Sequence, residues 1–415
     1  MFDAHRIAPR LSRISATARA CAVACVALAA ASLPQRIAAQ DAPPRPALAA
    51  GADTADWEAY YDYAVVQLRR SGEKAGDGFY WAARLDPSRP EPLYGQWVAF
   101  WVPRLDQFVR YLDDDRAIVQ SPMARAADSL RYSAQVRNPF VHQGLLLVLF
   151  DMLPGIWGDD AITRAWLAYA NGHRSAAERF ALAVRQNKRR VWLREDYARA
   201  LAVNGDFAGA SSELTTVLSS LRLEDERRVV RVYQSKAMLE YSIALLHVAR
   251  GDTSAAEESL GRALVEDVAF HPAHVVLATL ALASGDTATA ITEYALAVDI
   301  APDNVVARMG HGAALIAAGR PREAAVAFEA AIGLEPYYAD ARLNLAIAHE
   351  GSGDLARAVY AYEDYLERAP RRAIEGVTLA RARHAAVSAA YLRQQSTGAR
   401  TAPASPTSPA QSLAP

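Results

Sequence analysis

The chain has 415 residues, which is too long for one ordinary compact core and indicates two or three domains or an extended repeat. Hydrophobic residues make up 52% and charged residues 22% of the sequence, so we expect most of it to fold. The net charge of −1 gives no electrostatic reason to expect nucleic-acid binding.

Residues 1–39 have the pattern of a secretory signal peptide. Basic residues between Arg6 and Arg19 precede a run of small and apolar residues at 20–33, and Ala39 offers a cleavage point. The fourteen residues of this run are too few to span a bilayer comfortably, which favours a cleaved signal peptide. An uncleaved anchor is the alternative interpretation. We therefore expect an exported protein, periplasmic or envelope-associated.

Both cysteines of the chain, Cys21 and Cys25, lie inside this segment. After cleavage the chain would have no disulfide, no thiolate metal site and no cysteine nucleophile, so its stability would come from packing alone. A lipid anchor on Cys25 is a further alternative, although Ala22 occupies the place where leucine is usual in a lipobox.

Residues 40–54 are expected from their composition to be a flexible leader. The spacing of Ala75, Phe79, Ala82 and Pro87 predicts a helical hairpin at 55–89. Residues 90–157 are expected to be a helical insertion. Its run at 140–157 is the most apolar piece after the signal segment, but an aspartate and a proline interrupt it, so it is not a membrane span. A buried helix is one interpretation of this run, and a patch that faces a partner or a membrane is the other.

A period of 34 residues dominates the second half of the chain. Two series of residues have this spacing: Gly251, Gly285, Gly319 and Gly353, and Pro302, Pro336 and Pro370. An alanine follows each of these glycines by five residues, at Ala256, Ala290, Ala324 and Ala358. A large side chain follows each alanine by four residues, at Leu260, Tyr294, Phe328 and Tyr362.

This pattern resembles the tetratricopeptide repeat, a helix–turn–helix unit of the same length. Small residues let its two helices approach closely, an aromatic side chain fills the hole before the next hairpin, and proline ends the second helix. The resemblance implies an all-α fold, namely a right-handed α-solenoid of such hairpins with an irregular N-terminal helical part. It is close over residues 237–372 and weaker over 158–236, where Ala181 and Leu214 take the aromatic position.

The C-terminal residues are predicted to end the repeat. Residues 373–395 have an amphipathic helical pattern, and a terminal helix that caps the open face of the last repeat is common in solenoids. Residues 396–415 are rich in Ser, Thr, Pro and Ala, so we expect a disordered tail. Twelve additional residues near 218–229 are predicted to lengthen helices or a loop.

The resemblance also implies a binding surface, because the first helices of successive tetratricopeptide repeats line a concave groove. The family's carboxylate clamp needs Lys, Arg and Asn at fixed groove positions, and this chain lacks that set. Its groove positions are mostly apolar and aromatic, which suits an amphipathic helix or an extended peptide, although several of them could instead be core residues. The residues expected to contact a partner are Trp166, Tyr169, Trp192, Arg199, Tyr241, Leu245, Val248, Val275, Leu282, Met309, Ile316, Leu343 and Ile347.

Catalytic motifs are missing from the sequence. It contains no nucleophile elbow, no HExxH, no P-loop and no dinucleotide-binding fingerprint. His271 and His274 could present two ligands to a metal, but no third ligand is near in sequence. We expect no cofactor, no metal and no catalysis.

The predicted function is therefore a non-catalytic protein–protein interaction scaffold of the cell envelope, which binds a protein or peptide in its concave groove and does not bind nucleic acid. The alternative is an enzyme or ligand-binding module with a pocket between residues 90–157 and the repeats. Membrane contact through residues 140–157 is a third hypothesis. The sequence specifies neither the partner nor the oligomeric state.

Overall fold

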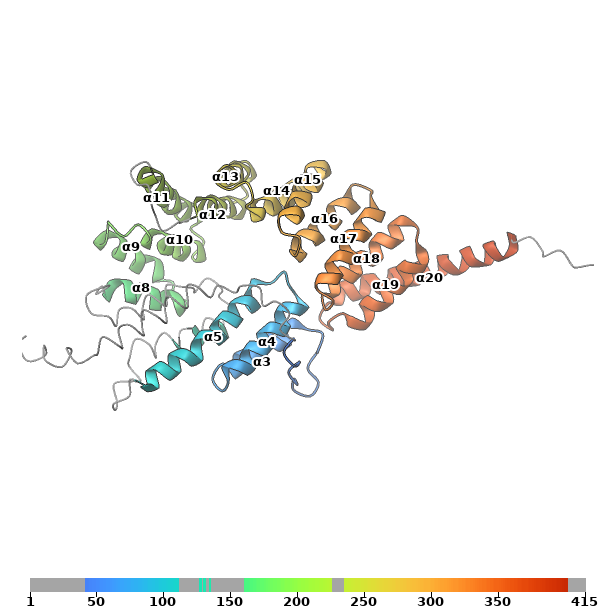
Figure 1. Cartoon of the computed structure of the whole chain (residues 1–415), viewed down its shortest axis with the longest axis horizontal. Coiled ribbons are helices and arrows are strands. Elements are labelled where there is room, and N and C mark those ends of the chain that lie inside the picture. The colour runs from blue at the N-terminus through green and yellow to red at the C-terminus, as the bar shows by residue number, and fades with distance from the viewer. Residues whose placement is uncertain are drawn as a thin grey trace, which may run out of the picture. The chain divides into compact units, whose positions relative to one another are not determined.

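The computed structural model describes residues 42–111, 160–225 and 235–401, together with six residues between 127 and 135 (Figure 1). The predicted signal segment at 1–39 and the apolar run at 140–157 lie outside the described residues. The described helices belong to one compact unit, which begins at Arg45. All regular secondary structure in the described part is helical, which confirms the predicted all-α class.

The helices follow one another as hairpins in chain order (Figure 1). The N-terminal helices are α3 (Trp57–Gln67), α4 (Gly72–Leu85) and α5 (Pro90–Tyr111). The middle helices are α8 (Asp160–Ala170), α9 (Ala176–Gln186), α10 (Leu193–Val203) and α11 (Phe207–Asp225). The regular hairpins are α12 (Lys236–Ala249) with α13 (Thr253–Glu266), α14 (His271–Ser284) with α15 (Thr287–Ile300), α16 (Val305–Ala317) with α17 (Pro321–Leu334), and α18 (Ala339–Ser352) with α19 (Leu355–Arg368).

The turn inside each regular hairpin has a local chemical cause. Gly251, Gly285, Gly319 and Gly353 all have φ between 72° and 86°, a left-handed conformation that costs little only for glycine. In three of these turns an aspartate follows the glycine, and its side chain accepts a hydrogen bond from the backbone N–H three residues on. Glycine thus ends the first helix, and the aspartate begins the second.

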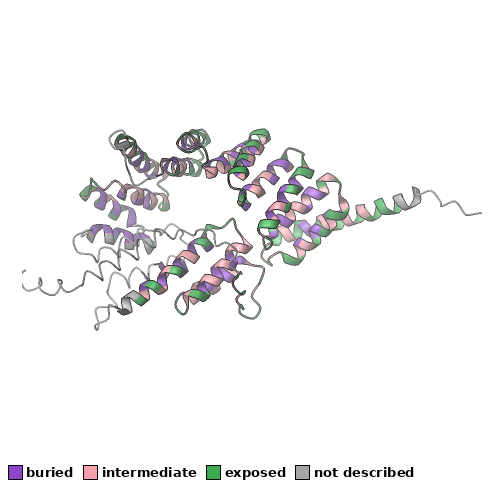
Figure 2. Cartoon of the chain, in the orientation of Figure 1, coloured by how far each residue is buried: buried purple, intermediate pink, exposed green. Residues whose placement is uncertain are grey.

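Small and large side chains alternate in the core of the regular hairpins, as the periodic pattern predicts. Figure 2 shows the buried segments of these helices in purple. The four alanines of the series that begins at Ala256 are fully buried, and Phe328 and Tyr362 are buried beside them. A Cβ atom at Gly312 would lie 2.5 Å from the Phe328 ring, so only glycine allows this approach. The small residues are therefore helix contact points.

The last helix, α20 (Ile374–Thr401), packs Ala380 and Val387 against Tyr362 and Tyr365 of α19. It extends six residues beyond the predicted capping segment, which was expected to end at residue 395. Once the packed part of a helix has formed, each further turn adds hydrogen bonds without a new nucleation cost. None of the described helices is long and apolar enough to cross a lipid bilayer.

The first hairpin contacts two turns of the regular repeats. Arg84 on α4 forms an ion pair with Glu335, which follows α17. Arg372, which follows α19, lies 2.9 Å from the Asp56 carboxylate and 2.6 Å from that of Glu58. These pairs join residues that are far apart in the chain, and we call this region the junction.

Candidate functional site

The exposed apolar residues of the predicted groove gather on α12. Leu245 and Val248 expose 40% and 38% of their surface, and Tyr241 is half-buried. Met238 lies one turn before Tyr241 and exposes 49%. Spacings of three and four residues place these side chains on the same face of a helix. We call Met238, Tyr241, Leu245 and Val248 the α12 stripe.

Met238 is not among the groove residues predicted from the sequence. It stands at the second position of the repeat that begins at residue 237, one turn before the predicted groove residue Tyr241. Val306 occupies the equivalent position of its own repeat and is also exposed. The repeat register therefore contained the signal that identifies Met238.

Most of the remaining predicted groove residues are half-buried and contribute to the packing between helices. Val275 and Leu282 of α14 pack against a core cluster that includes Tyr294. Their counterparts on α16 and α18 pack in the same way, namely Met309, Ile316, Leu343 and Ile347. Trp192 is also half-buried, at the start of α10. A substantial part of the surface of each of these side chains is therefore buried, as expected for core residues.

Two predicted groove residues are buried rather than exposed, which corrects the sequence prediction. Trp166 and Tyr169 of α8 contact the Phe180 ring edge-on, with ring centroids 5.3 Å and 6.3 Å away. In this hairpin the small residue Ala181 takes the position where the regular repeats have a large side chain. The aromatic residues of α8 thus pack with Phe180, the neighbour of Ala181 on α9.

Arg199, another predicted groove residue, is engaged by neighbouring carboxylates on α10. Its guanidinium donates a hydrogen bond of 2.5 Å to Asp196 and lies 3.7 Å from Glu195. Burial raises the pKa of Asp196 to about 8, although the charge of Arg199 opposes this shift. These intramolecular contacts engage part of the Arg199 guanidinium.

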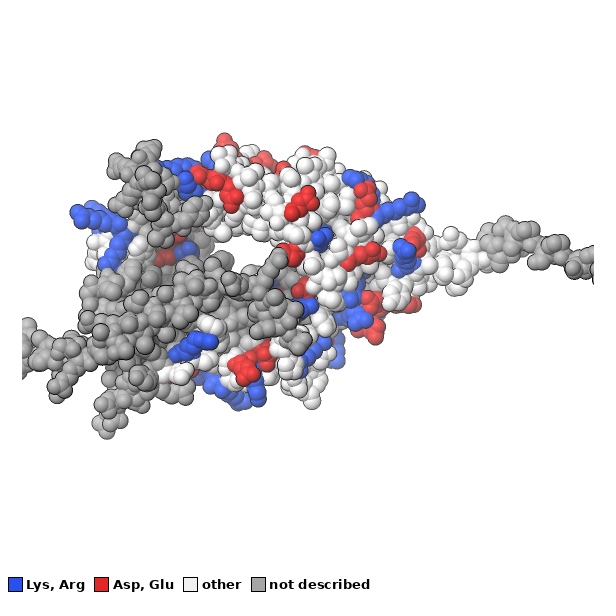
Figure 3. Space-filling model, in the orientation of Figure 1, with Lys and Arg blue, Asp and Glu red and all other residues white. Residues whose placement is uncertain are grey.

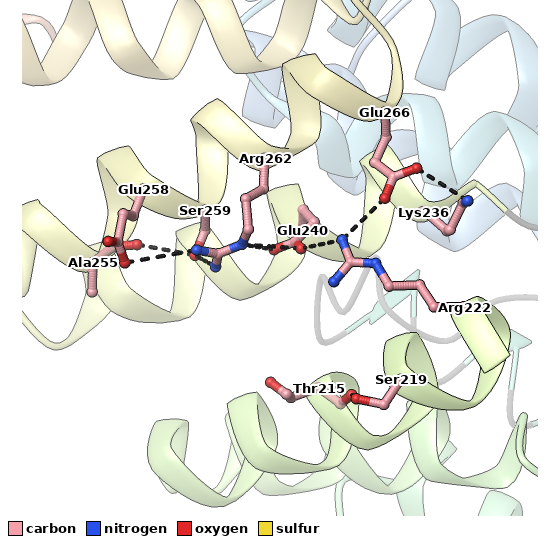
Figure 4. Close-up of polar contacts among 10 residues, drawn as sticks. All are labelled: Thr215, Ser219, Arg222, Lys236, Glu240, Ala255, Glu258, Ser259, Arg262 and Glu266. Atoms are coloured by element: carbon pink, nitrogen blue, oxygen red, sulfur yellow. Dashed lines mark hydrogen bonds and ion pairs between the residues drawn. The ribbon is translucent and has the colours of Figure 1, made fainter.

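A polar cluster fixes α12 from its buried side (Figure 4). The carboxylate of Glu240 is almost fully buried and accepts hydrogen bonds from Arg222 at 3.0 Å and from Arg262 at 3.1 Å. Arg222 also contacts Glu266 at 3.0 Å, and Arg262 donates to Ser259 at 2.8 Å. A buried carboxylate needs such partners to offset the loss of water. The cluster therefore ties α11, α12 and α13 together and sets the orientation in which α12 presents its stripe.

In the histidine pair at the start of α14, His274 has a carboxylate partner on α15. His274 is buried, and its Nδ1 lies 2.7 Å from a Glu293 carboxylate oxygen. The described residues contain no group of three or more His, Cys, Asp or Glu side chains placed to hold a metal ion. Of the region proposed for an enzymatic pocket, residues 90–157, the structure describes α5 and six further residues, so that alternative falls mostly outside the described part.

Acidic and basic side chains are interspersed over the face of the molecule drawn in Figure 3. Within the described residues visible there, no large area carries a single sign of charge.

Two family models described as tetratricopeptide repeat match the chain, one over residues 241–305 and the other over 315–381. No curated protein matches it. Among solved structures, MamA is 22% identical over 41% of this chain and 93% of its own, with a TM-score of 0.36. YrrB, a TPR protein described as having an unusual peptide-binding site, is 19% identical over 47% of this chain and 94% of its own, with a TM-score of 0.38. The C-terminal part of a TPR repeat-containing protein from Cytophaga hutchinsonii is 16% identical over 49% and 78%, with a TM-score of 0.42.

Proposed function

Because this chain is a tetratricopeptide-repeat protein, and so a protein–protein interaction scaffold, we propose that it binds its partner on the α12 stripe. The observation that carries this proposal is the exposure of Met238, Leu245 and Val248 on one face of one helix. Single exposed apolar residues are common on protein surfaces, whereas a contiguous group of them indicates an interaction site.

The form of the stripe indicates the form of the partner. It extends from residue 238 to residue 248, and ten residues of helix rise about 15 Å. A partner helix with apolar residues at i, i+3 or i+4, and i+7 would cover that length, as would an extended peptide with alternating apolar side chains. The methionine suits both, because its unbranched side chain adapts to different surfaces.

We also propose that the protein acts without catalysis and in the cell envelope. The location rests on the signal-like pattern of residues 1–39 and on no structural observation. Cell fractionation, with sequencing of the N-terminus of the purified protein, tests it. A new N-terminus near residue 40 in the periplasmic fraction is the expected result, and an intact N-terminus in the cytoplasmic fraction would contradict it.

The test of the binding surface compares two substitutions in the same hairpin. Leu245→Arg places a charge in the α12 stripe, and Val265→Arg places one on α13, where the native side chain is 88% exposed. Both proteins should fold, which circular dichroism can verify. Partners that cross-link to the wild-type protein in envelope extracts should be at least tenfold depleted with Leu245→Arg. They should be retained with Val265→Arg.

One outcome would contradict the proposed binding surface. If Leu245→Arg retains the same cross-linked proteins as the wild type, the α12 stripe is not the binding surface. For a partner identified in this way, calorimetric titration of the purified pair should show the same loss of affinity for Leu245→Arg. An unchanged dissociation constant would contradict the proposal.

A further inference from the structure

Arg45, in the segment predicted as a flexible leader, is held over three aromatic rings. Its guanidinium carbon lies 5.1 Å from the ring centroids of Tyr60 and Trp81 and 5.8 Å from that of Tyr337. All three distances fall within the range of cation–π attraction. Tyr60 belongs to α3, Trp81 to α4, and Tyr337 to the turn after α17. Tertiary contacts thus connect Arg45 of the leader to the helical repeats.

The three rings form a prearranged cage. Trp81 and Tyr337 meet edge to face, with centroids 5.0 Å apart and an interplanar angle of 77°. Tyr60 and Trp81 are buried, whereas Tyr337 is exposed. The Arg84 guanidinium carbon lies 5.5 Å from the centroid of the Tyr337 ring, and Arg84 pairs with Glu335, which holds this turn against α4.

The contacts of Arg45 indicate recognition by rings rather than by opposite charge. Its guanidinium donates a hydrogen bond to the Thr54 carbonyl oxygen, and among the described residues no carboxylate forms an ion pair with it. A planar guanidinium can stack on aromatic faces while its N–H groups donate in the plane. An ammonium group shares the charge but not this geometry.

The sequence around Arg45 suits presentation of one side chain. Pro44 and Pro46 flank it, and residues 42–49 adopt no regular secondary structure. Each proline restricts φ and removes a backbone donor, so the segment loses little entropy when it binds in an extended form. We propose that Tyr60, Trp81 and Tyr337 form a binding site for the arginine of a proline-flanked extended peptide, and that the chain's own leader occupies it.

This site is separate from the α12 stripe, and the inference does not depend on the proposed function. It predicts that a peptide with the chemistry of the leader binds the cage in trans once Arg45 no longer fills it. The test uses the full chain with Arg45→Gln. The Arg45 side chain is exposed, so its replacement is compatible with folding. Two fluorescent peptides are titrated, one with the sequence of residues 42–50 and one with glutamine in place of its arginine.

We expect the arginine peptide to bind the Arg45→Gln chain at least tenfold more tightly than the glutamine peptide does. It should also bind that chain at least tenfold more tightly than it binds the wild type, in which the cage is filled at high effective concentration. Tyr337→Leu in the Arg45→Gln background should abolish the preference. This position is suitable because Tyr337 is exposed, so its replacement is compatible with folding.

Equal affinity for the two peptides, measured up to about 1 mM, would overturn the proposal. So would an arginine preference that persists after Tyr337→Leu, since the arginine would then bind elsewhere. If the arginine peptide binds the wild-type and Arg45→Gln chains with equal affinity, the proposal that the leader occupies the cage is wrong. Circular dichroism of each variant shows that the compared chains are folded.

Discussion

The interior of the regular repeats and the junction are held together by different interactions. In the interior, Ala324 and Phe328 are buried among apolar side chains, and equivalent contacts recur in each hairpin. At the junction, Arg84 and Arg372 form ion pairs that remain partly exposed to water. Burial of apolar surface contributes about 25 cal/mol per Å², whereas an exposed ion pair typically contributes less than about 1 kcal/mol. The periodic contacts therefore stabilise the fold, whereas the aperiodic contacts determine which distant parts of the chain meet.

The carboxylates of the junction illustrate this difference. Burial raises the pKa of Glu335 above its ordinary value, and the opposing charge of Arg84 offsets only part of the shift. Burial likewise raises the pKa of Asp56, despite a backbone hydrogen bond and the charge of Arg372. The ionised forms of both carboxylates are therefore less favourable in the folded protein than in water.

The largest expected effect is in the periodic interior. Phe328→Ala should lower the free energy of unfolding by about 3–5 kcal/mol, because it removes a buried ring and leaves a cavity beside Gly312. Val326→Ala on the same helix is the matched control, since Val326 is exposed. Denaturation followed by circular dichroism measures both. Similar losses for the two variants would contradict the assignment of Phe328 to the core.

Buried charge should matter more than exposed charge with the same partner. Glu240→Gln should cost about 2 kcal/mol of stability, because two guanidinium groups lose a buried carboxylate. Glu258 is an exposed control that lies 3.7 Å from the same Arg262. Glu258→Gln should change stability by less than about 0.5 kcal/mol. If the two substitutions had equal effects, the polar cluster would not stabilise α12.

A pH titration tests the buried charge on α10. Because the pKa of Asp196 is raised to about 8 in the folded protein, the native state keeps a proton that the unfolded chain releases. This contribution to stability is fully present below the ordinary pKa of aspartate and is lost as the pH rises toward 8. Asp196→Asn should therefore become more stable relative to the wild type, by about 2 kcal/mol between pH 5 and pH 6.5.

Stability curves of both proteins at several pH values measure this difference. The expected size follows the single-proton limit of about 1.4 kcal/mol per pH unit, because the pKa of about 8 already includes the opposing charge of Arg199. A difference that is independent of pH would show that Asp196 is ionised throughout.

Glycine at a helix contact should be distinguishable from glycine at an open position. Gly312→Ala places a methyl group against the Phe328 ring and should cost about 1 kcal/mol after the gain in helix propensity. A Cβ atom at Gly261 would meet nothing within 4 Å, so Gly261→Ala should stabilise the protein by up to about 1 kcal/mol. Chemical denaturation gives both values, and effects of the same sign would show that the close approach at Gly312 is unimportant.

The smallest expected effect is at the junction. Arg372→Gln should reduce stability by less than about 1 kcal/mol at low salt, and the difference should disappear near 1 M salt through screening. Hydrogen exchange of the α3 amides should detect it, because Arg372 contacts Asp56 and Glu58 at the start of that helix. Arg357→Gln, which removes an exposed local pair with Asp354, should leave exchange in α3 unchanged. Faster exchange that persists at high salt would contradict an electrostatic contact.

The periodic part of the fold was predictable because its causes are local. Glycine at Gly285 and Gly353 permits the left-handed turn, and the buried alanine and aromatic positions follow from close helix packing. The candidate site was predictable only in part. The repeat register located the first helices, but the exposure of each side chain depends on what packs over it. Trp166 was therefore predicted at the surface and is buried, whereas Leu245 is exposed.

The sequence by itself determined the helical hairpins of residues 237–372, their turns and their small-residue contacts, because each depends on neighbours within one repeat. The tertiary structure alone decided that Arg84 meets Glu335 and that the rings of Tyr60, Trp81 and Tyr337 surround Arg45. These contacts occur once and join residues from opposite ends of the chain. No local preference specifies such a pairing, since it depends on how all the intervening helices pack and therefore on where the paired residues lie in space.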